Sequence, residues 1–325
     1  MKFLIIRFSS IGDIVLTTPV IRCLRKRYPQ AAIHFLTKQK FAGVIQNNPY
    51  LDKIHILFDE INSTIEALKA ENFDYIIDLH HNVRTLRIKK ALKMKAYSFN
   101  KLNIEKWLLV SLKINVLPEK HIVDRYMETL KHLDVRNDNL GLDYFIPERD
   151  FVKQQDIPVS HSHGYIGIAI GAAHNTKKLP VNKLKELCSK IDHPIILLGD
   201  KTDYANAFII ASIDPIKIYN SCGKFNLNES ADIIKKAKVI ITHDTGLMHI
   251  AAAFKKNIIS VWGNTVPAFG MYPYQTNYKN AEAKKLWCRP CSKIGFQKCP
   301  LGHFKCMENQ SIDGIVEAVA RYLKM

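Results

Sequence analysis

The chain has 325 residues, 47% of them hydrophobic and 24% charged, which supplies enough apolar surface for two domain cores and excludes a mainly disordered chain. The longest mostly apolar runs are about half as long as the roughly 18–20 residues of a membrane-spanning helix, so a membrane-spanning protein is excluded as well. The formal net charge of +17 favours anionic partners, namely phosphorylated ligands, nucleic acid or anionic membrane surfaces.

Short apolar runs alternate with amphipathic segments along the first half, a pattern typical of βαβ units on a parallel sheet. Pro19 is expected to bend the first helix, because proline lacks the amide that a helix interior needs. The basic stretch Arg84–Lys113 then interrupts the alternation. The expected strands are Lys2–Ile6, Ala32–Leu36, Lys53–Ile56 and Tyr75–Leu79, and the expected helices are Asp13–Arg27, Gln39–Asn47, Asn62–Glu71 and Ile122–Leu133.

A second alternating series follows residues Pro147–Gly164, which lack a clear period and are interpreted as a linker. We therefore predict two α/β domains, residues 1–155 and 156–325, with ligands at the carboxyl ends of their strands. The last helix is a candidate for packing back on the first domain. The expected strands are Tyr165–Ile170, Pro194–Leu198, Ile216–Tyr219, Val239–Thr242 and Ile258–Val261, and the expected helices are Val181–Lys190, Thr202–Ser212, Leu227–Lys236, Gly246–Phe254 and Ile312–Leu323.

The segment Arg7–Asp13 follows the first strand directly. Its small residues, Ser10 and Gly12 among them, let the backbone turn tightly and approach a ligand, and the amides of the following helix favour an anion. Asp13 lies where the helix dipole stabilises a carboxylate, and a plain helix-capping role is the alternative. Neither the G-x-G-x-x-G fingerprint nor a phosphate loop ending in Gly-Lys-Ser/Thr is present, which argues against a nicotinamide oxidoreductase and a P-loop kinase.

The basic stretch holds nine Lys and Arg residues and one acid, Glu105, so a solvated basic face is its simplest interpretation. It also contains Trp107-Leu108-Leu109-Val110, and basic side chains beside apolar ones are how a peripheral protein meets an anionic bilayer. Single-stranded nucleic acid is a weaker interpretation, because it needs aromatic stacking platforms among the basic residues and few lie in this stretch.

Two loops of the second half have features of anion sites. Gly171–Pro180 combines small residues with Lys177 and Lys178 ahead of a helix, which suits a diphosphate; a plain strand-to-helix loop is the alternative. Thr242–Ala253 begins another helix, at whose positive end Thr245 and Gly246 offer a hydroxyl and backbone amides. Asp244 as a simple N-cap and His249 as a packed core histidine are the alternatives there.

Four of the seven cysteines lie close together in the sequence near the C-terminus: Cys288, Cys291, Cys299 and Cys306. They could ligate a structural zinc ion, but a second C-x2-C pair is missing, so packed thiols or a redox-labile pair are alternatives. An odd number of cysteines without a visible export signal favours a reducing, cytosolic compartment.

With these motifs, the chain resembles the ADP-heptose:lipopolysaccharide heptosyltransferases, the family-9 glycosyltransferases of Gram-negative bacteria, over nearly its whole length. The resemblance is carried by Arg7–Asp13 with Pro19 following, by Lys177–Pro180 and by Asp244–His249. The stretch Cys299–Cys306 resembles a subset of that family. One departure is Leu179, where many members have an aromatic residue, usually Trp.

The resemblance implies a GT-B fold, with two Rossmann-like domains facing each other across a cleft. It implies an inverting, metal-independent transfer of heptose from ADP-heptose to the inner core of lipopolysaccharide. Asp13 matches the family's general base, Lys177 its phosphate-binding lysine, and Asp244–Gly246 its donor-binding turn. The chemistry fits these residues, because a sugar hydroxyl needs a carboxylate to activate it and a departing diphosphate needs positive charge.

The remaining expectations concern ligands and location. Ser10 and Gly12 are expected to help bind the donor diphosphate, and the basic stretch to hold the phosphorylated lipid A–core acceptor. No cofactor and no nucleic acid are expected, and the location is cytoplasmic, peripheral at the inner face of the inner membrane. The alternatives are a same-fold transferase with another nucleotide sugar or acceptor, a non-catalytic lipopolysaccharide-binding scaffold and, more remotely, a nucleic-acid-binding protein. The candidate acceptor residues are His80, Asn82, Arg84 and Lys101.

Overall fold

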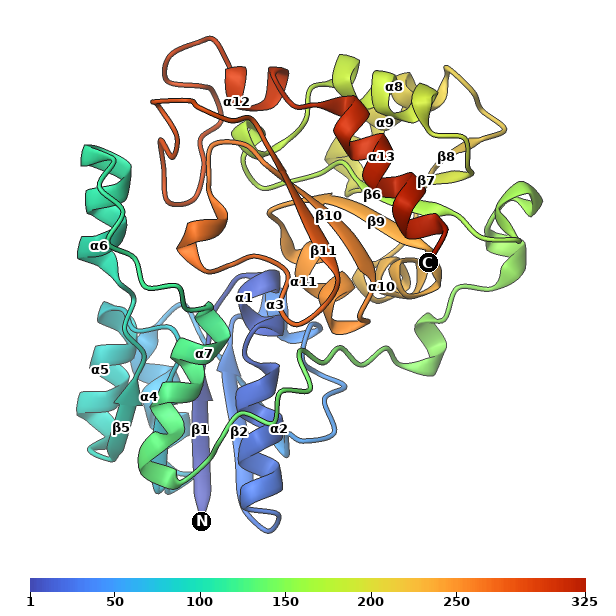
Figure 1. Ribbon diagram of the computed structural model, residues 1–325. Helices are drawn as coiled ribbons and strands as arrows, with labels where there is room; N and C mark the ends of the chain where they lie inside the picture. Colours follow the sequence, from blue (N-terminus) through green and yellow to red (C-terminus); the bar gives the residue numbers. More distant parts are fainter. The chain divides into compact units, whose positions relative to one another are not determined.

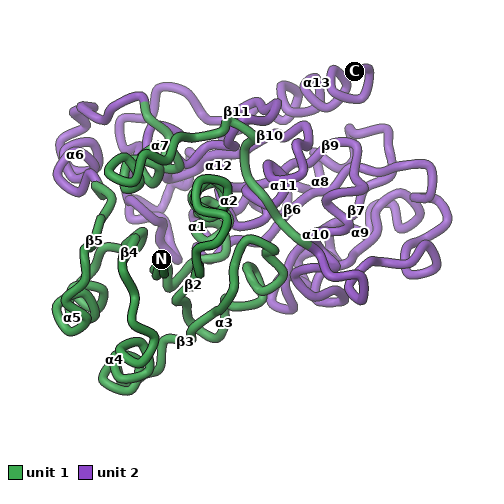
Figure 2. Tube along the Cα trace, turned by 90° about the horizontal axis from the view of Figure 1, so that it is seen from below, with its two compact units in different colours: residues 1–101, 120–145 green, residues 102–119, 146–325 purple.

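The computed structural model describes residues 1–325 (Figure 1), which form two compact units (Figure 2). The first unit is Met1–Lys101 with Lys120–Phe145, and the second is Leu102–Glu119 with Ile146–Met325. The sequence predicted a single boundary between residues 155 and 156. In the structure the second unit begins after Phe145 and also includes a segment from within the basic stretch.

The first unit is built on a five-stranded parallel sheet with the order β3-β2-β1-β4-β5. Four of its strands confirm the sequence prediction to within a residue. The edge strand β5 was not predicted, because it lies inside the basic stretch and is mostly exposed, so it carries no apolar run. The strands are β1 (Lys2–Ile6), β2 (Ala32–Thr37), β3 (Lys53–Ile56), β4 (Tyr75–Asp78) and β5 (Lys95–Ser98).

Helices cover this sheet, as both faces of a parallel sheet require. Leu4 and Ile6 of β1 pack in one core with Ile65 of α4 and Ile88 of α5. The alternate residues of the strand, Phe3 and Ile5, are equally buried. Helices α2 and α7 contact each other in the same unit. The helices are α1 (Ile11–Val15), α2 (Thr18–Arg27), α3 (Gln39–Ala42), α4 (Ile61–Lys69), α5 (Val83–Leu92) and α7 (Ile122–Met127), the last continued by a 3-10 helix (Glu128–Leu133).

The first predicted helix, Asp13–Arg27, is two helices in the structure. Helix α1 ends at Val15, and α2 begins at Thr18 with Pro19 in its first turn. Proline is favoured there, because a first-turn amide has no partner within the helix. The proline therefore belongs to the start of a helix and does not bend one.

The second unit has a six-stranded parallel sheet with the order β11-β10-β9-β6-β7-β8. Five of the strands were expected, and the edge strand β11 was not, because it is polar and largely exposed. The strands are β6 (Ile166–Ala169), β7 (Ile195–Leu198), β8 (Ile218–Asn220), β9 (Val239–His243), β10 (Asn257–Trp262) and β11 (Tyr278–Glu282).

The helices of the second unit include the last one of the chain, which packs against α8, β9, β10 and β11 of this unit. Its residues Ile315 and Val319 belong to the unit's core, so its apolar face is already used here. No helix of the chain has the length and hydropathy that crossing a bilayer requires. The helices are α6 (Asn103–Trp107), α8 (Val181–Lys190), α9 (Tyr204–Ala211), α10 (Leu227–Lys236), α11 (Gly246–Ala253), α12 (Lys305–Glu308) and α13 (Ile312–Leu323).

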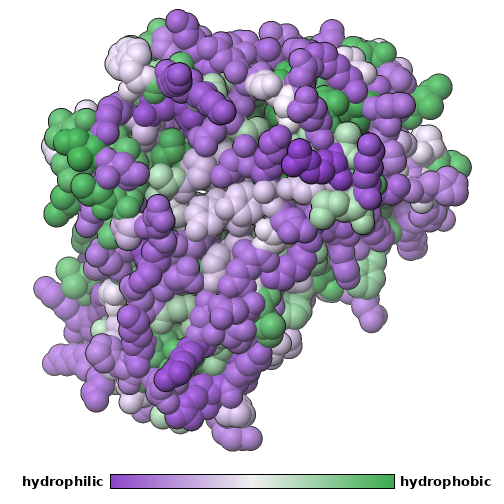
Figure 3. Space-filling view, viewed as in Figure 1, coloured by the Kyte–Doolittle hydropathy of each residue, from purple (hydrophilic) through white to green (hydrophobic).

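Helix α6 and the π-helical turn that follows it (Leu108–Leu112) come from the basic stretch and belong to the second unit. Lys113 donates a hydrogen bond to the Pro290 carbonyl at 2.6 Å, and Lys293 donates one to the Asn103 carbonyl at 3.2 Å. These hydrogen bonds join the segment to the loop around Pro290 of the second unit. Hydrophobic side chains gather on the surface at the place of α6 (Figure 3).

Each sheet has one point at which its strand order reverses. In the first unit this point lies between β1 and β4, and in the second between β6 and β9. Loops that leave the carboxyl ends of such a strand pair diverge, and ligands of α/β proteins bind there. The segments singled out in the sequence follow these four strands.

Candidate active site

Asp13 is held by groups of its own loop. Its Oδ1 lies 2.7 Å from Nη2 of Arg7, and its Oδ2 accepts hydrogen bonds from the Ser10 amide at 3.1 Å and the Ser10 hydroxyl at 2.9 Å. The side chain is 19% exposed. Asp13 therefore closes a capping box at the start of α1, as the capping interpretation expects, and is still in part accessible.

Burial raises the pKa of Asp13, but the adjacent Arg7 guanidinium and the hydrogen bonds from Ser10 outweigh burial and hold that pKa below its usual value. The carboxylate is consequently ionised at neutral pH, which is the state that a general base requires. The same attraction makes it a weaker proton acceptor than a free carboxylate.

Arg7 connects three parts of the first unit. Its Nη1 donates to the Leu79 carbonyl at 2.6 Å and to the Tyr126 hydroxyl at 3.0 Å, and its Nε donates to the Ser9 carbonyl at 2.7 Å. The guanidinium thus fixes Asp13 relative to the end of β4 and to α7. Sequence reasoning assigned no role to Arg7 or Tyr126; an arginine directly after the apolar run Phe3–Ile6 was the available signal.

His80 lies in the same neighbourhood, after β4. Its ring packs on Phe8 at 4.6 Å between centroids, and its Nδ1 is buried without a hydrogen-bond partner. Burial and the positive charges of Arg7 and Lys101 lower the pKa of His80 to about 4. His80 is therefore neutral at pH 7 and offers a hydrogen bond, not a charge.

The other predicted acceptor residues have different surroundings. Asn82 caps α5, since its side-chain oxygen accepts from the Thr85 amide at 3.0 Å. Arg84 is exposed in the first turn of α5. Lys101 is half-buried and close enough to His80 for its positive charge to lower the pKa of that histidine. Lys89 of the basic stretch is used structurally, because it lies 2.8 Å from the buried Asp78 carboxylate.

In the second unit, two predicted donor-site residues meet. Lys177 follows β6, and its Nζ lies 2.6 Å from Oδ2 of Asp244, which follows β9. The Thr265 hydroxyl donates to the same Oδ2 at 3.0 Å. The structure thus places a lysine and a carboxylate at the reversal point of this sheet, together with a threonine that sequence reasoning missed.

Thr245 and Gly246 begin helix α11 beside this pair. Thr245 has an extended backbone, and its side chain makes no capping hydrogen bond to the helix. The first-turn amides of α11 therefore have no side-chain cap and carry the positive end of the helix dipole. His249 is buried within the same helix, which fits a packed core histidine.

The rest of the lysine loop is fixed internally. The Leu179 amide donates to Nε2 of His243 at 2.9 Å, and burial lowers the pKa of His243 to about 4, so this histidine is neutral. Lys178 lies 2.8 Å from the buried Asp203. Leu179 itself belongs to the core of the unit. Because Lys178 is paired with Asp203 and Lys177 with Asp244, Lys177 is the lysine of this loop that lies at the predicted site.

The structure gives no support to a zinc site at the four C-terminal cysteines. All four thiols are free, and no three of them lie within the 4.8 Å of one another that a shared ion needs. Burial first, and then the neighbouring thiols, raise the pKa of Cys306 to about 12. A packed thiol fits the buried Cys306, whereas Cys288, Cys291 and Cys299 are only partly buried.

A cluster with metal-ligand side chains occurs elsewhere, at His34, His55 and Glu71. Nδ1 of His34 and Nε2 of His55 share a hydrogen bond of 2.9 Å, which joins β2 to β3. Glu71, however, already binds the ammonium groups of Lys2 at 3.0 Å and Lys53 at 2.5 Å. A cation here would meet two positive charges, so we interpret the cluster as a structural network.

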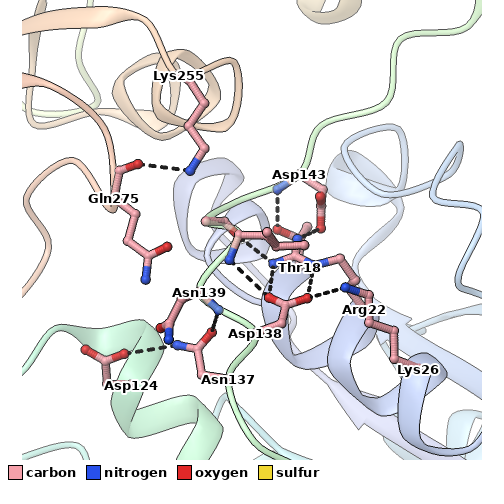
Figure 4. A network of polar contacts seen from close by, with 12 residues as sticks. Thr18, Arg22, Lys26, Asp124, Asn137, Asp138, Asn139, Asp143, Lys255 and Gln275 are labelled. Atoms are coloured by element: carbon pink, nitrogen blue, oxygen red, sulfur yellow. Dashed lines mark hydrogen bonds and ion pairs between the residues drawn. The ribbon is translucent and has the colours of Figure 1, made fainter.

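A second structural network surrounds Arg22 of α2 (Figure 4). Its Nη2 lies 2.8 Å from Asp138, it also pairs with Asp143, and Lys26 lies 2.7 Å from Asp138. The Asp143 amide donates to the Thr18 hydroxyl at 2.9 Å. The network ties the segment after α7 to α2 within the first unit, and nothing in it points to a ligand.

Comparison with known proteins gives consistent results. A family model described as glycosyltransferase family 9 (heptosyltransferase) matches residues 61–301. The chain is 24% identical to lipopolysaccharide heptosyltransferase 1 of Campylobacter coli over 82% of its own length and 84% of that protein. A family-9 glycosyltransferase structure from Veillonella parvula matches with a TM-score of 0.81 and 21% identity, covering 99% of this chain and 97% of that one.

The structure of the ADP-heptose lipopolysaccharide heptosyltransferase II of Escherichia coli matches with a TM-score of 0.76 and 18% identity, covering 99% of this chain and 98% of that one. At these identities the two structures establish the fold, which is GT-B, and the family model covers well over half of the chain. The chain therefore belongs to glycosyltransferase family 9, the heptosyltransferase family, and is a glycosyltransferase.

Proposed function

We propose that the protein transfers heptose, with inversion, from ADP-heptose to the inner core of lipopolysaccharide. The observation that carries the proposal is the ionised Asp13 carboxylate, which Arg7 and Ser10 hold at the reversal point of the first sheet. The names of the relatives, an ADP-heptose lipopolysaccharide heptosyltransferase among them, support this donor and this acceptor.

In this proposal the second unit binds the donor diphosphate. Lys177 exchanges part of its contact with Asp244 for a phosphate oxygen, while Thr265 keeps Asp244 in place. The Thr245 hydroxyl and the amides from Gly246 onward bind the same group from the start of α11. Ser10 and Gly12 of the first unit are proposed as further contacts of the diphosphate.

The first unit binds the acceptor and removes its proton. Asp13 accepts the proton of an acceptor hydroxyl, whose oxygen bonds to the anomeric carbon of the heptose as the bond from that carbon to the diphosphate breaks. The electron pair of that bond leaves with ADP, and the positive charge around Lys177 stabilises it, so the proposal involves no metal and no cofactor. Arg7 acts as a positioning residue for Asp13.

His80, Asn82, Arg84 and Lys101 are proposed to bind the acceptor core. Arg84 is exposed and charged and suits a phosphate or carboxylate of the acceptor, whereas the neutral His80 suits a hydroxyl. Because such an acceptor carries a lipid, we propose a cytoplasmic location, peripheral at the inner face of the inner membrane.

The test is transfer from ADP-heptose to a truncated lipopolysaccharide, with the wild type compared with Asp13→Asn. Loss of the base should lower the rate on the order of 10²–10⁴-fold. Unchanged ADP binding and a native circular-dichroism spectrum at the assay temperature serve as controls for folding, because removing the partner of the buried Arg7 is itself expected to lower the melting temperature. Equal transfer by the two proteins would remove Asp13 as the base.

A same-fold transferase with a different nucleotide sugar is the second candidate, since the lysine loop has Leu179 where many relatives are expected to have Trp. Melting temperatures with ADP and with UDP separate the two candidates. Stabilisation by ADP alone supports the adenine nucleotide, and stabilisation by UDP alone favours the second candidate.

A further inference from the structure

Apolar side chains are exposed on the segment 103–116, which comprises α6, the π-helical turn and the residues that follow. Five of them are more than half exposed: Ile104, Trp107, Leu112, Ile114 and Val116. Figure 3 shows hydrophobic side chains gathered at the place of α6. Large apolar side chains that gather on a surface mark an interaction site more often than isolated ones do.

The loop 284–305 of the same unit has the same character with added charge. Trp287, Ile294 and Leu301 are each more than half exposed. The loop contains six basic residues and no acidic one. Arg289 is paired with Glu282, and the five lysines of the loop are all exposed: Lys284, Lys285, Lys293, Lys298 and Lys305.

Hydrogen bonds join the two segments. Lys113 donates to the Pro290 carbonyl at 2.6 Å, and Lys293 donates to the Asn103 carbonyl at 3.2 Å. Both contacts lie within the second unit, so the two segments form one surface of it, here named the tryptophan surface (residues 103–116 and 284–305).

We propose that the tryptophan surface docks on the interface of an anionic phospholipid bilayer. The proposal rests on the proposed function only in that the acceptor carries a lipid. Trp107 and Trp287 suit the headgroup level, where one side of the indole is apolar and the other is wet. Ile104, Leu112 and Leu301 enter the acyl boundary, and the lysines bind anionic headgroups.

The positive charge of the tryptophan surface favours an anionic bilayer over a second copy of the chain. A second copy of the chain docked through the same patch would bring its lysines against these lysines, because a two-fold interface pairs a patch with itself. Trp107 and Trp287 could stack on nucleic acid bases, but the exposed aliphatic side chains, such as Ile104 and Leu301, would stay in water in such a complex. An anionic bilayer satisfies both the apolar and the basic side chains.

The experiment is flotation of the full chain with two kinds of vesicle: phosphatidylethanolamine with phosphatidylglycerol, and phosphatidylcholine alone. The wild type should float with the anionic vesicles and less as salt is added. The double variant Trp107→Ser with Trp287→Ser should lose about tenfold in binding, and Lys285→Glu with Lys298→Glu a similar amount. Phe208→Ser is the matched control, because Phe208 is 62% exposed on α9, outside the tryptophan surface.

The proposal is overturned if the wild type does not float with anionic vesicles at low salt, or if the tryptophan variant floats as well as the wild type. Sedimentation that shows a dimer in the wild type and a monomer in the tryptophan variant identifies a second copy as the occupant, and also overturns it. Transfer to a delipidated, water-soluble acceptor should be equal in wild type and variant. Absence of that transfer in the wild type contradicts the proposed function and leaves the flotation result to decide the docking.

Discussion

The two reversal points use charge in different ways. In the first unit, Asp13 is held by a buried arginine that has further partners on β4 and α7, so its geometry is fixed by the fold. In the second unit, Lys177 and Asp244 satisfy each other at 2.6 Å, and Lys177 has no other side-chain partner. The first arrangement suits a group that must be aimed, and the second suits a group that exchanges its partner for a ligand.

The largest effect should follow from removing the fixed charge. Arg7→Met leaves Asp13 without its cation and the Tyr126 hydroxyl without its partner, in a largely buried position. Loss of one member of a buried pair costs about 3–5 kcal/mol of unfolding free energy. Urea denaturation measures it, with Arg87→Met, at an exposed position of α5, as the control that should change little. A near-neutral Arg7→Met would mean that Asp13 is not held as described.

The exchangeable pair should be distinguished by ligand binding. Lys177→Met should weaken ADP binding by about 10–100-fold, the effect of one charged hydrogen bond, and should lower stability by no more than about 1–3 kcal/mol, since Asp244 is 12% exposed and keeps the hydrogen bond from Thr265. Lys178→Met is the matched control, because its partner Asp203 is buried. That variant should lose about 1–3 kcal/mol of stability and bind ADP normally. Calorimetric titration with ADP decides, and equal ADP affinities of the two variants would contradict the assignment.

These contrasts show what the sequence was able to predict. Apolar runs identified the buried strands, and the residues directly after β1, β6 and β9 lie at the reversal points, because strand ends and small residues are local signals. The edge strands β5 and β11 were missed, since an exposed strand carries no apolar run. Pro19 was misjudged because its effect depends on where a helix begins.

The partners of the site residues were beyond the sequence. Tyr126 reaches Arg7 from 119 positions away along the chain, and Thr265 reaches Asp244 from 21 positions away. Such contacts depend on how distant segments pack, which no local pattern encodes. The same holds for the segment 103–116, which hydrogen bonds of Lys113 and Lys293 join to a loop more than 170 positions further along the chain.

A smaller effect is expected at Asn82, and it tells a structural role from a binding role. Asn82→Ala removes the cap of α5 and should cost about 1 kcal/mol. Asn82→Ser restores the cap. If Asn82 also binds the acceptor, the serine variant has normal stability but a raised KM for the acceptor; if both are normal, Asn82 is a cap only.

The smallest effect on transfer concerns the charge of His80. Its pKa is lowered to about 4, so it is already neutral from pH 8 down to pH 6, and His80→Gln should leave the shape of the pH–rate profile there unchanged.

The free energy of unfolding, in contrast, should depend on the protonation of His80. The unfolded chain binds a proton at His80 near pH 6.5, before the folded chain does, so this residue's contribution to stability is full above that pH and falls as the pH drops toward 4. Denaturation of wild type and His80→Gln at pH 7 and pH 5 should therefore show a smaller loss of stability on acidification in the variant. An acidic limb of the rate profile that moves with this substitution would mean that His80 titrates during transfer, and that the first reversal point holds a second exchangeable charge.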